Sequence, residues 1–201
     1  MQTLYNLTKA LDKNAILGDI VECGVNKGWS AGMLATASEN SLYDRTLWLF
    51  DSFMGLPKPN EVDGPQVDHR AGTILGSEDK VLELMEKLAI SPKRVRIVSG
   101  WFENTVKTAE IDRIGLLHLD ADLYESTKLT LETFYDRVSE GGYVVLDDYG
   151  DNKWKGARLA TDEFISSRHL RVEMQKSDRH GYWFQKSSVL SAFHSSIQFS
   201  Q

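Results

Sequence analysis

Short apolar runs alternate with amphipathic segments along the chain, and this alternation predicts an α/β fold. Three apolar runs, at 20–25, 46–51 and 114–119, each lead into a turn or an acidic residue, as buried strands of a parallel sheet do. Small residues at 29–38 predict a helix between the first two runs, which makes a βαβ unit. Further strands are predicted at 95–98 and 142–147.

The remaining periodic segments predict helices that pack on this sheet. Leu4, Leu7 and Leu11 recur at helical spacing and predict an N-terminal helix within residues 1–17. Other helices are predicted at 77–88, 125–138 and 157–165. Two last apolar runs, 170–174 and 182–185, predict a hairpin, so we expect one antiparallel strand at an edge of the sheet.

Two segments lack periodicity. Residues 52–76 contain four glycines and three prolines, which predicts a lid-like loop, a ligand-binding loop or a disordered segment. Residues 187–201 are serine-rich and weakly patterned, so we expect a loose tail or a docking arm. No repeat or linker divides the chain, and we expect residues 1–201 to form one domain.

Composition narrows the classes of function. The 201 residues are 41% hydrophobic and 26% charged, as in an ordinary globular protein. A formal net charge of −6 without any basic cluster argues against binding to nucleic acid or to a membrane surface. The single cysteine, Cys23, excludes an internal disulfide and fits a reducing compartment. With no signal peptide and no membrane span in the sequence, we expect a cytoplasmic protein.

Acidic residues stand at two predicted strand exits. Asp120 follows the strand at 114–119, and Asp147 and Asp148 follow the next one. Because parallel strands end at the same edge of a sheet, we expect these three carboxylates to converge and to bind Mg²⁺ or a similar cation. An acidic pair can also simply cap the next helix, and for Asp122 we favour that capping role over that of a fourth ligand.

The first strand ends in a glycine turn that suits a ligand. Glu22, Gly24 and Gly28 form E-x-G-x-x-x-G, which lets the backbone approach a bound molecule but departs from the usual dinucleotide pattern. Glu22 would attract an ammonium group, and Asp51, at the second strand's exit, would accept hydrogen bonds from ribose hydroxyls. A ligand with an ammonium group at one end and a ribose at the other would satisfy both residues, which favours S-adenosylmethionine (SAM). Trp101 fits two roles equally, stacking on its adenine or packing in the core, and we expect further cofactor contacts from Ser30, Ser52, Gly100 and Asp120.

Five segments, ECGVNKG, DSFMGLPKP, SGWF, HLDADLYEST and GGYVVLDDYG, occur in this order between residues 18 and 184. With them the chain resembles the macrocin-type (TylF/MycF) O-methyltransferases. The resemblance implies the class I methyltransferase fold, a Rossmann-like doubly wound sheet of seven strands with the last antiparallel. It also implies SAM and Mg²⁺ as cofactors and a hydroxyl of a sugar or other natural product as acceptor. Asp120, Asp147 and Asp148 match the family's metal aspartates.

We therefore expect a SAM- and Mg²⁺-dependent O-methyltransferase in which the cation activates an acceptor hydroxyl. Asp120 or His69 would take the proton, and neither is preferred. A homo-oligomer is possible. Two alternatives stay open: a glycosyltransferase that uses Asp-x-Asp to hold a cation and a sugar nucleotide, and a non-catalytic module that binds SAM. The chain is shorter than the antibiotic-tailoring members of the family, so the resemblance leaves the acceptor undefined.

Overall fold

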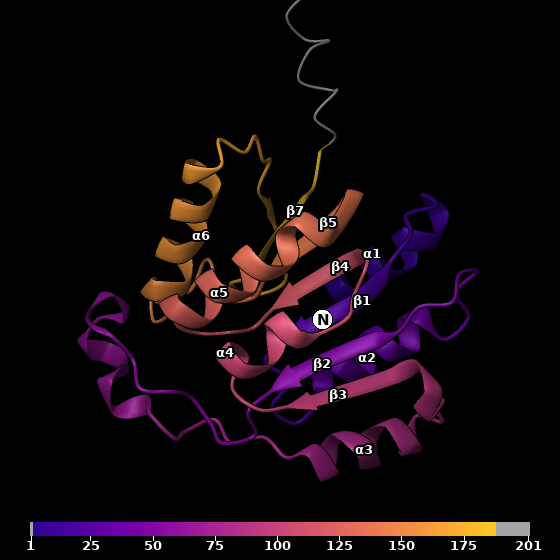
Figure 1. The fold of residues 1–201 in the computed structure, drawn as a ribbon, viewed down its shortest axis with the longest axis horizontal. Helices are drawn as coiled ribbons and strands as arrows, with labels where there is room; N and C mark the ends of the chain where they lie inside the picture. Colours follow the sequence, from indigo (N-terminus) through magenta and orange to yellow (C-terminus); the bar gives the residue numbers. More distant parts are fainter. Residues whose placement is uncertain (1, 188–201) are drawn as a thin grey trace, which may run out of the picture.

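The computed structural model describes residues 2–187, in which one mixed sheet is covered by helices on both faces (Figure 1). The strands are β1 (Asp19–Cys23), β2 (Leu47–Asp51), β3 (Val95–Ser99), β4 (Ile114–Leu119), β5 (Val138–Leu146), β6 (Gln175–Lys176) and β7 (Tyr182–Gln185). Their order in the sheet is β3-β2-β1-β4-β5-β7-β6, and β7 runs antiparallel to both of its neighbours. The predicted seven-stranded, doubly wound sheet with a late antiparallel strand is confirmed.

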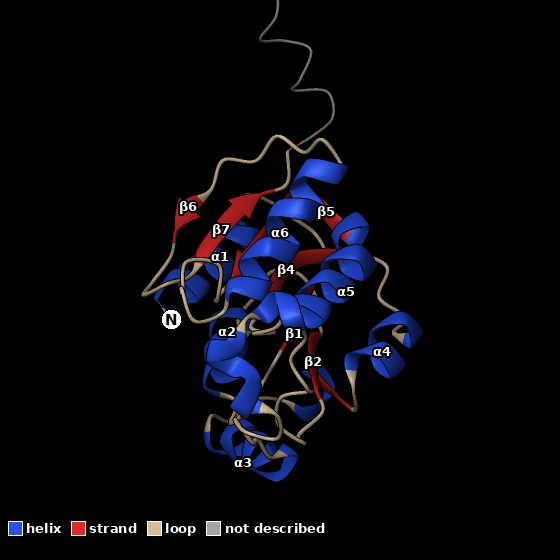
Figure 2. Ribbon diagram, turned by 90° about the vertical axis from the view of Figure 1, so that its left-hand side faces the viewer, coloured by secondary structure: helices blue, strands red, loops and turns tan. Residues whose placement is uncertain are grey.

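The helices divide between two apolar layers (Figure 2). They are α1 (Gln2–Lys13), α2 (Trp29–Ser38), α3 (Glu78–Lys87), α4 (Phe102–Thr105), α5 (Tyr124–Phe134) and α6 (Lys155–Ser167). Leucines of α1 and α2 and Val81 of α3 pack on one face of the sheet. Leu131 and Phe134 of α5 and Phe164 of α6 pack on the other. Within residues 2–187, no helix combines the length and the apolar character needed to cross a bilayer.

Three predicted boundaries were wrong. The N-terminal helix ends at Lys13 rather than near residue 17, because the chain turns at Ala15 with a positive φ of 53°. Helix α5 ends at Phe134, a short 3-10 turn (Tyr135–Arg137) follows, and β5 already begins at Val138. The glycine pair at 141–142 lies inside β5, where the pairing register with β4 shifts.

The predicted final hairpin is present, but its first strand was placed wrongly. Residues 170–174 carry no strand, although Leu170, Val172 and Met174 pack their side chains on the second apolar layer. The first strand of the hairpin is β6, which is only two residues long, pairs with β7 and forms the edge of the sheet. The expected tail lies almost entirely at 188–201, outside the described residues.

Residues 52–76 form an ordered segment with two 3-10 turns, Glu61–Asp63 and Pro65–Arg70. Leu56 and Val67 of this segment join Leu123, Trp154 and Ala157 in a third, small apolar cluster. The segment, purple at the left of Figure 1, therefore packs against the beginnings of α5 and α6. It forms a wall next to the carboxyl edge of the sheet.

Candidate active site at the carboxyl edge of the sheet

Backbone hydrogen bonds align the exits of the central strands. The Asp120 N–H donates to the Cys23 carbonyl, and the Asp147 N–H donates to the Leu119 carbonyl, each at 2.9 Å. Because β1, β4 and β5 are parallel neighbours, these bonds bring the glycine turn and both acidic segments to one edge. The convergence predicted from the strand exits is thus present in the backbone.

Gly24 is required at the β1 exit by the closeness of β4. A Cβ atom at this position would lie 1.9 Å from the Asp120 carbonyl oxygen, and the φ of Gly24 is +91°. No other residue fits both constraints without moving the strand exit. The glycine therefore allows the turn after β1 and the acidic segment after β4 to lie in contact.

Asp51 shapes the glycine turn through its carboxylate. Its Oδ2 accepts hydrogen bonds from the backbone N–H groups of Val25, at 2.7 Å, and Asn26, at 2.8 Å. Its Oδ1 accepts one from the Phe53 N–H at 2.7 Å. The side chain thus holds the turn where a ligand would sit, and it retains lone pairs for a ribose hydroxyl.

A cavity of about 770 Å³ opens beside this turn. Of the residues predicted to bind the cofactor or metal, seven line it: Gly24, Asp51, Ser52, Trp101, Asp120, Asp147 and Asp148. Glu22, Gly28, Ser30 and Gly100 do not line it, and the candidate base His69 is exposed elsewhere on the loop wall. Leu56, Lys58 and Asn60 of the loop wall also line the cavity, together with Lys153 and Trp154.

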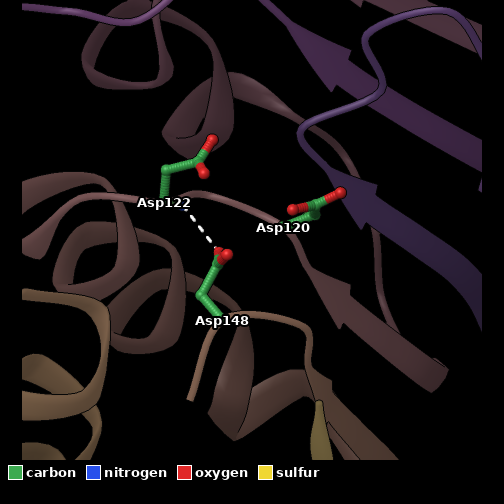
Figure 3. A group of neighbouring side chains, drawn as sticks. All are labelled: Asp120, Asp122 and Asp148. Carbon is green, nitrogen blue, oxygen red and sulfur yellow. Dashed lines mark hydrogen bonds between the residues drawn. The ribbon is translucent and has the colours of Figure 1, made fainter. Parts of the chain in front are cut away.

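Three carboxylates that line this cavity lie close together (Figure 3). Asp120, Asp122 and Asp148 each offer an oxygen within 4.8 Å of the oxygens of the other two. Asp148 is 7% exposed, and its Oδ2 accepts a hydrogen bond from the Asp122 N–H at 2.9 Å. Asp122 has a positive φ of 59°, which turns the chain out of the strand and points its carboxylate back to the cluster.

Burial and mutual repulsion raise the pKa of all three carboxyl groups well above the ordinary value. Burial is the largest cause in each case, followed for Asp120 by the charge of Asp148 and for Asp122 by that of Asp120. The charges of Lys153 and Arg70 oppose the rise in the pKa of Asp122. Within residues 2–187, no lysine or arginine forms a salt bridge with any of the three.

This donor set fits a divalent cation. Hard oxygen ligands at close range are what Mg²⁺ and Mn²⁺ prefer, and a doubly charged ion would relieve the repulsion that raises these pKa values. Asp147 was predicted to be the third ligand, but its carboxylate is exposed and is not part of the close group. It still lines the cavity, and its charge contributes to the raised pKa of Asp120.

The preferred role of Asp122 as a helix cap was wrong. Helix α5 has Leu123 at its N-cap position, with no side-chain cap from that residue. The N–H of Tyr124 instead donates to Oδ1 of Asp63, at 2.7 Å, from the loop wall. The sequence held a signal for Asp122, since it shares the side of Asp120 in an extended segment, but none for a cap 61 residues away.

Glu22 lies under the turn. Its side chain is fully buried, and its Oε1 lies 2.8 Å from Nδ1 of His118 on the neighbouring strand β4. Burial alone would lower the pKa of His118, but the hydrogen bond and charge of Glu22, with the charges of Asp120 and Asp147, raise it. The second oxygen of Glu22 and Nε2 of His118 have no partner among the described residues.

Comparison with known proteins gives the family. The model of the macrocin-O-methyltransferase (TylF) family matches residues 1–186. The chain belongs to this family. It is 36% identical over 181 residues to the demethyldecarbamoylnovobiocin O-methyltransferase of Streptomyces niveus, covering 87% of this chain and 68% of that protein. It is 29% identical over 205 residues to the mycinamicin III 3''-O-methyltransferase of Micromonospora griseorubida, covering 94% and 77%.

Solved structures agree with this assignment. The O-methyltransferase NovP superposes with a TM-score of 0.82 at 31% identity, over 93% of this chain and 79% of that one. The calicheamicin methyltransferase CalS11 superposes with a TM-score of 0.74 at 25% identity, over 92% and 76%. The predicted class I methyltransferase fold and the predicted O-methyltransferase activity are therefore confirmed for this TylF-family chain, and neither the glycosyltransferase nor the non-catalytic alternative is supported.

Proposed function

We propose that this chain transfers the methyl group of SAM to a hydroxyl of a small molecule, with a divalent cation held by the carboxylate cluster. One observation carries the proposal: the glycine turn at Gly24 and the clustered acids Asp120, Asp122 and Asp148 line the same cavity. The turn suits the donor, and the cluster lies next to it because Gly24 contacts Asp120. SAM and the acceptor hydroxyl can thus meet in one cavity.

The donor would lie across the exits of β1 and β2. Gly24 and Asn26 of the turn and the carboxylate-bearing Asp51 line this part of the cavity, and Trp101 also lines it and offers an aromatic surface. SAM, when bound there, supplies an electrophilic methyl group. The side chain of Glu22 pairs with His118, and its predicted contact with the ammonium group of SAM stays a prediction.

Asp120 and Asp148 would hold the cation, with Asp122 or Asp147 as the third carboxylate. The close grouping favours Asp122, whereas the family resemblance favours Asp147. A divalent cation bound there would lower the pKa of an acceptor hydroxyl and orient it. Leu56 and Trp154 would exclude water from the acceptor hydroxyl, since they give the cavity an apolar lining.

Methyl transfer also requires a base near the cluster that accepts the proton of the acceptor hydroxyl. Asp120 and Asp122 both line the cavity, and burial with neighbouring charge raises the pKa of both, which makes each a stronger base. A carboxylate that holds a cation is a poorer base, and Asp120 would be a ligand, so Asp122 would take the proton where Asp147 completes the ligand set. Methyl transfer then forms an oxygen–carbon bond, breaks a sulfur–carbon bond and leaves S-adenosylhomocysteine (SAH).

The acceptor class follows from the relatives. Their names specify methylation of demethyldecarbamoylnovobiocin, of the 3'' position of mycinamicin III and of a rhamnosyl group on tetracenomycin C. We propose a glycosylated natural product or its sugar precursor as acceptor, handled inside the cytoplasm. A homo-oligomer is compatible with this proposal, and neither nucleic acid nor a membrane is needed for it.

Calorimetry with SAH and a methyl-transfer assay with labelled SAM test the proposal together. We expect SAH to bind, and we expect label to be transferred to demethyldecarbamoylnovobiocin or mycinamicin III only when Mg²⁺ or Mn²⁺ is present. Transfer that EDTA leaves unchanged would contradict the role of the cation. Absence of SAH binding would contradict the whole proposal.

A further inference from the structure

Asp63 is a buried carboxylate outside the cluster. It lies in the loop wall at the end of the first 3-10 turn and is only 2% exposed. Burying a charge in a loop is costly unless its oxygens are hydrogen-bonded. Both oxygens of Asp63 are bonded: Oδ1 accepts from the Tyr124 N–H at 2.7 Å, and Oδ2 accepts from the Asn60 N–H at 2.9 Å.

These two bonds connect the two sides of the cavity. On one side, Asn60 and Asp63 form a reciprocal capping box that fixes the wall lined by Leu56, Lys58 and Asn60. On the other side, Tyr124 is the first residue of α5 and comes two residues after Asp122. Asp63 therefore bonds at once to the loop wall and to the segment that carries the clustered acids.

The start of α6 closes around the same carboxylate. A Cβ atom at Gly156 would lie 1.9 Å from Oδ1 of Asp63 and 2.9 Å from the Tyr124 nitrogen. The absence of a side chain at Gly156 is thus needed for the hydrogen bond between Asp63 and Tyr124. Two helices that begin at this point, α5 and α6, both direct their N-terminal ends to Asp63, which favours its negative charge.

The acidic segment depends on this external anchor. Asp122 has a positive φ, and its own N–H is held by Asp148. The Asp122 N–H donates to Asp148 and the Tyr124 N–H donates to Asp63, so hydrogen bonds fix both ends of this three-residue stretch. A backbone turn of this kind persists only where its surroundings hold it, and here the loop wall does so.

We infer that Asp63 is a positioning residue: through the Tyr124 N–H it fixes the acidic segment relative to the loop wall, and so it sets the geometry of the cation site without touching the cation or the donor. This inference rests on the proposed function. It predicts that damage at Asp63 weakens cation binding and leaves the donor side intact, because the turn after β1 is held separately by Asp51.

Two substitutions break the same contact from different sides. Asp63→Asn places an NH₂ group against either the Asn60 or the Tyr124 N–H, where two donors cannot bond. Gly156→Ala substitutes none of the acids and adds a good helix former, yet its Cβ displaces the carboxylate of Asp63. Glu61→Gln is the matched control, because Glu61 lies in the same 3-10 turn but is exposed and does not line the cavity.

The test measures SAH binding by calorimetry and Mn²⁺ binding to the SAH-loaded protein by electron paramagnetic resonance. We expect both damaging variants to retain SAH affinity and to lose Mn²⁺ affinity by about 10–100-fold, as for residues that orient metal ligands. The control should match the unmodified chain. Unchanged Mn²⁺ affinity in either damaging variant, or an equal loss of SAH and Mn²⁺ binding, overturns the inference.

Hydrogen exchange separates failure of this inference from failure of the proposed function. If the unmodified chain binds no Mn²⁺, the cation part of the proposed function is wrong, and amide exchange then decides the role of Asp63. We expect exchange to rise together at 56–63 and 120–124 in both damaging variants, with β1 and α2 unchanged. A rise confined to 56–63 would show that the acidic segment does not depend on Asp63.

Discussion

The carboxylate of Asp148 accepts a hydrogen bond from the backbone N–H of Asp122, with 2.9 Å between nitrogen and Oδ2. The buried acid at the exit of β5 thereby fixes the turn that brings the carboxylate of Asp122 into the cluster. The same side chain is a proposed cation ligand. Its two roles can be separated by substitution, because an amide oxygen can accept the backbone hydrogen bond but is a poorer ligand for Mg²⁺.

We therefore expect Asp148→Asn to keep the thermal stability of the chain. We expect it to reduce cation-dependent methyl transfer by about 100-fold, because loss of a metal ligand should cost at least as much activity as loss of a residue that orients one. Asp148→Ala should lose the activity and also the turn at Asp122, with a lower melting temperature. Melting curves and transfer of labelled methyl groups check both. Full activity of Asp148→Asn in the presence of EDTA would remove Asp148 from the cation site.

The third ligand is decided by a matched pair, Asp122→Asn and Asp147→Asn. The close grouping of carboxyl oxygens includes Asp122 and leaves out Asp147, which is exposed at the cavity rim. We expect Asp122→Asn to reduce Mn²⁺ affinity more than Asp147→Asn does, measured by paramagnetic resonance on the SAH-loaded protein. The reverse order would assign the third position to Asp147.

Stability of the cation-free protein should depend on pH in an unusual direction. Burial and repulsion raise the folded-state pKa of Asp120, Asp122 and Asp148 above the unfolded value of about 3.9. The native state therefore binds more protons than the unfolded state above that pH, and the free energy of unfolding falls as pH rises from about 4 towards the raised pKa values. His118, whose pKa is also raised, adds a loss of the same sign as pH rises beyond about 6.5.

With EDTA present, we thus expect the melting temperature to increase when pH is lowered from neutral towards about 5. Below that, carboxylates such as Asp136, whose pKa is lowered chiefly by its hydrogen bond from Arg168, lose their contribution and stability falls again. Mg²⁺ should raise the melting temperature most at neutral pH and flatten the profile, because cation binding favours the ionised carboxylates. A profile that Mg²⁺ leaves unchanged would contradict a cation at this cluster.

Features close in sequence were predictable, and contacts between distant segments were not. Apolar runs and glycine turns located the central strands, and the acids at their exits located the active-site edge. The register shift that places residues 141–142 inside β5 arises from pairing with β4, which no local pattern encodes. In the same way, Asp63 caps α5 from 61 residues away, so Asp122, next to that helix, was wrongly given the role.

The position of Glu22 shows the same limit. Its place in E-x-G-x-x-x-G suggests a ligand contact, but β1 and β4 align it with His118, and this pairing buries it below the turn. A strand exit alone does not tell which side chain faces the cavity and which faces the apolar layer under α1 and α2.

Asp51 controls the donor side of the site. Its carboxylate accepts three backbone hydrogen bonds, two of them from the turn at Val25 and Asn26. Hydrogen bonds to a charged group contribute about 1.5–3 kcal/mol each, so Asp51→Ala should release the turn. We expect SAH affinity to fall by about 10–100-fold in calorimetry, since one such bond corresponds to that range. Mn²⁺ binding should change little, and an unchanged SAH affinity would show that the turn does not form the donor site.

The buried pair of Glu22 and His118 provides the last prediction. His118→Leu leaves the carboxylate of Glu22 buried without a partner, and we expect it to lower the free energy of unfolding by about 3–5 kcal/mol. The double variant Glu22→Met/His118→Leu removes the stranded charge and should regain most of that loss in denaturant titrations. Because Glu22 does not line the cavity, we also expect the double variant to bind SAH with the affinity of the unmodified chain. Regained stability together with a large loss of SAH affinity would instead show that Glu22 contacts the ammonium group of the donor, as its place in the glycine motif suggests.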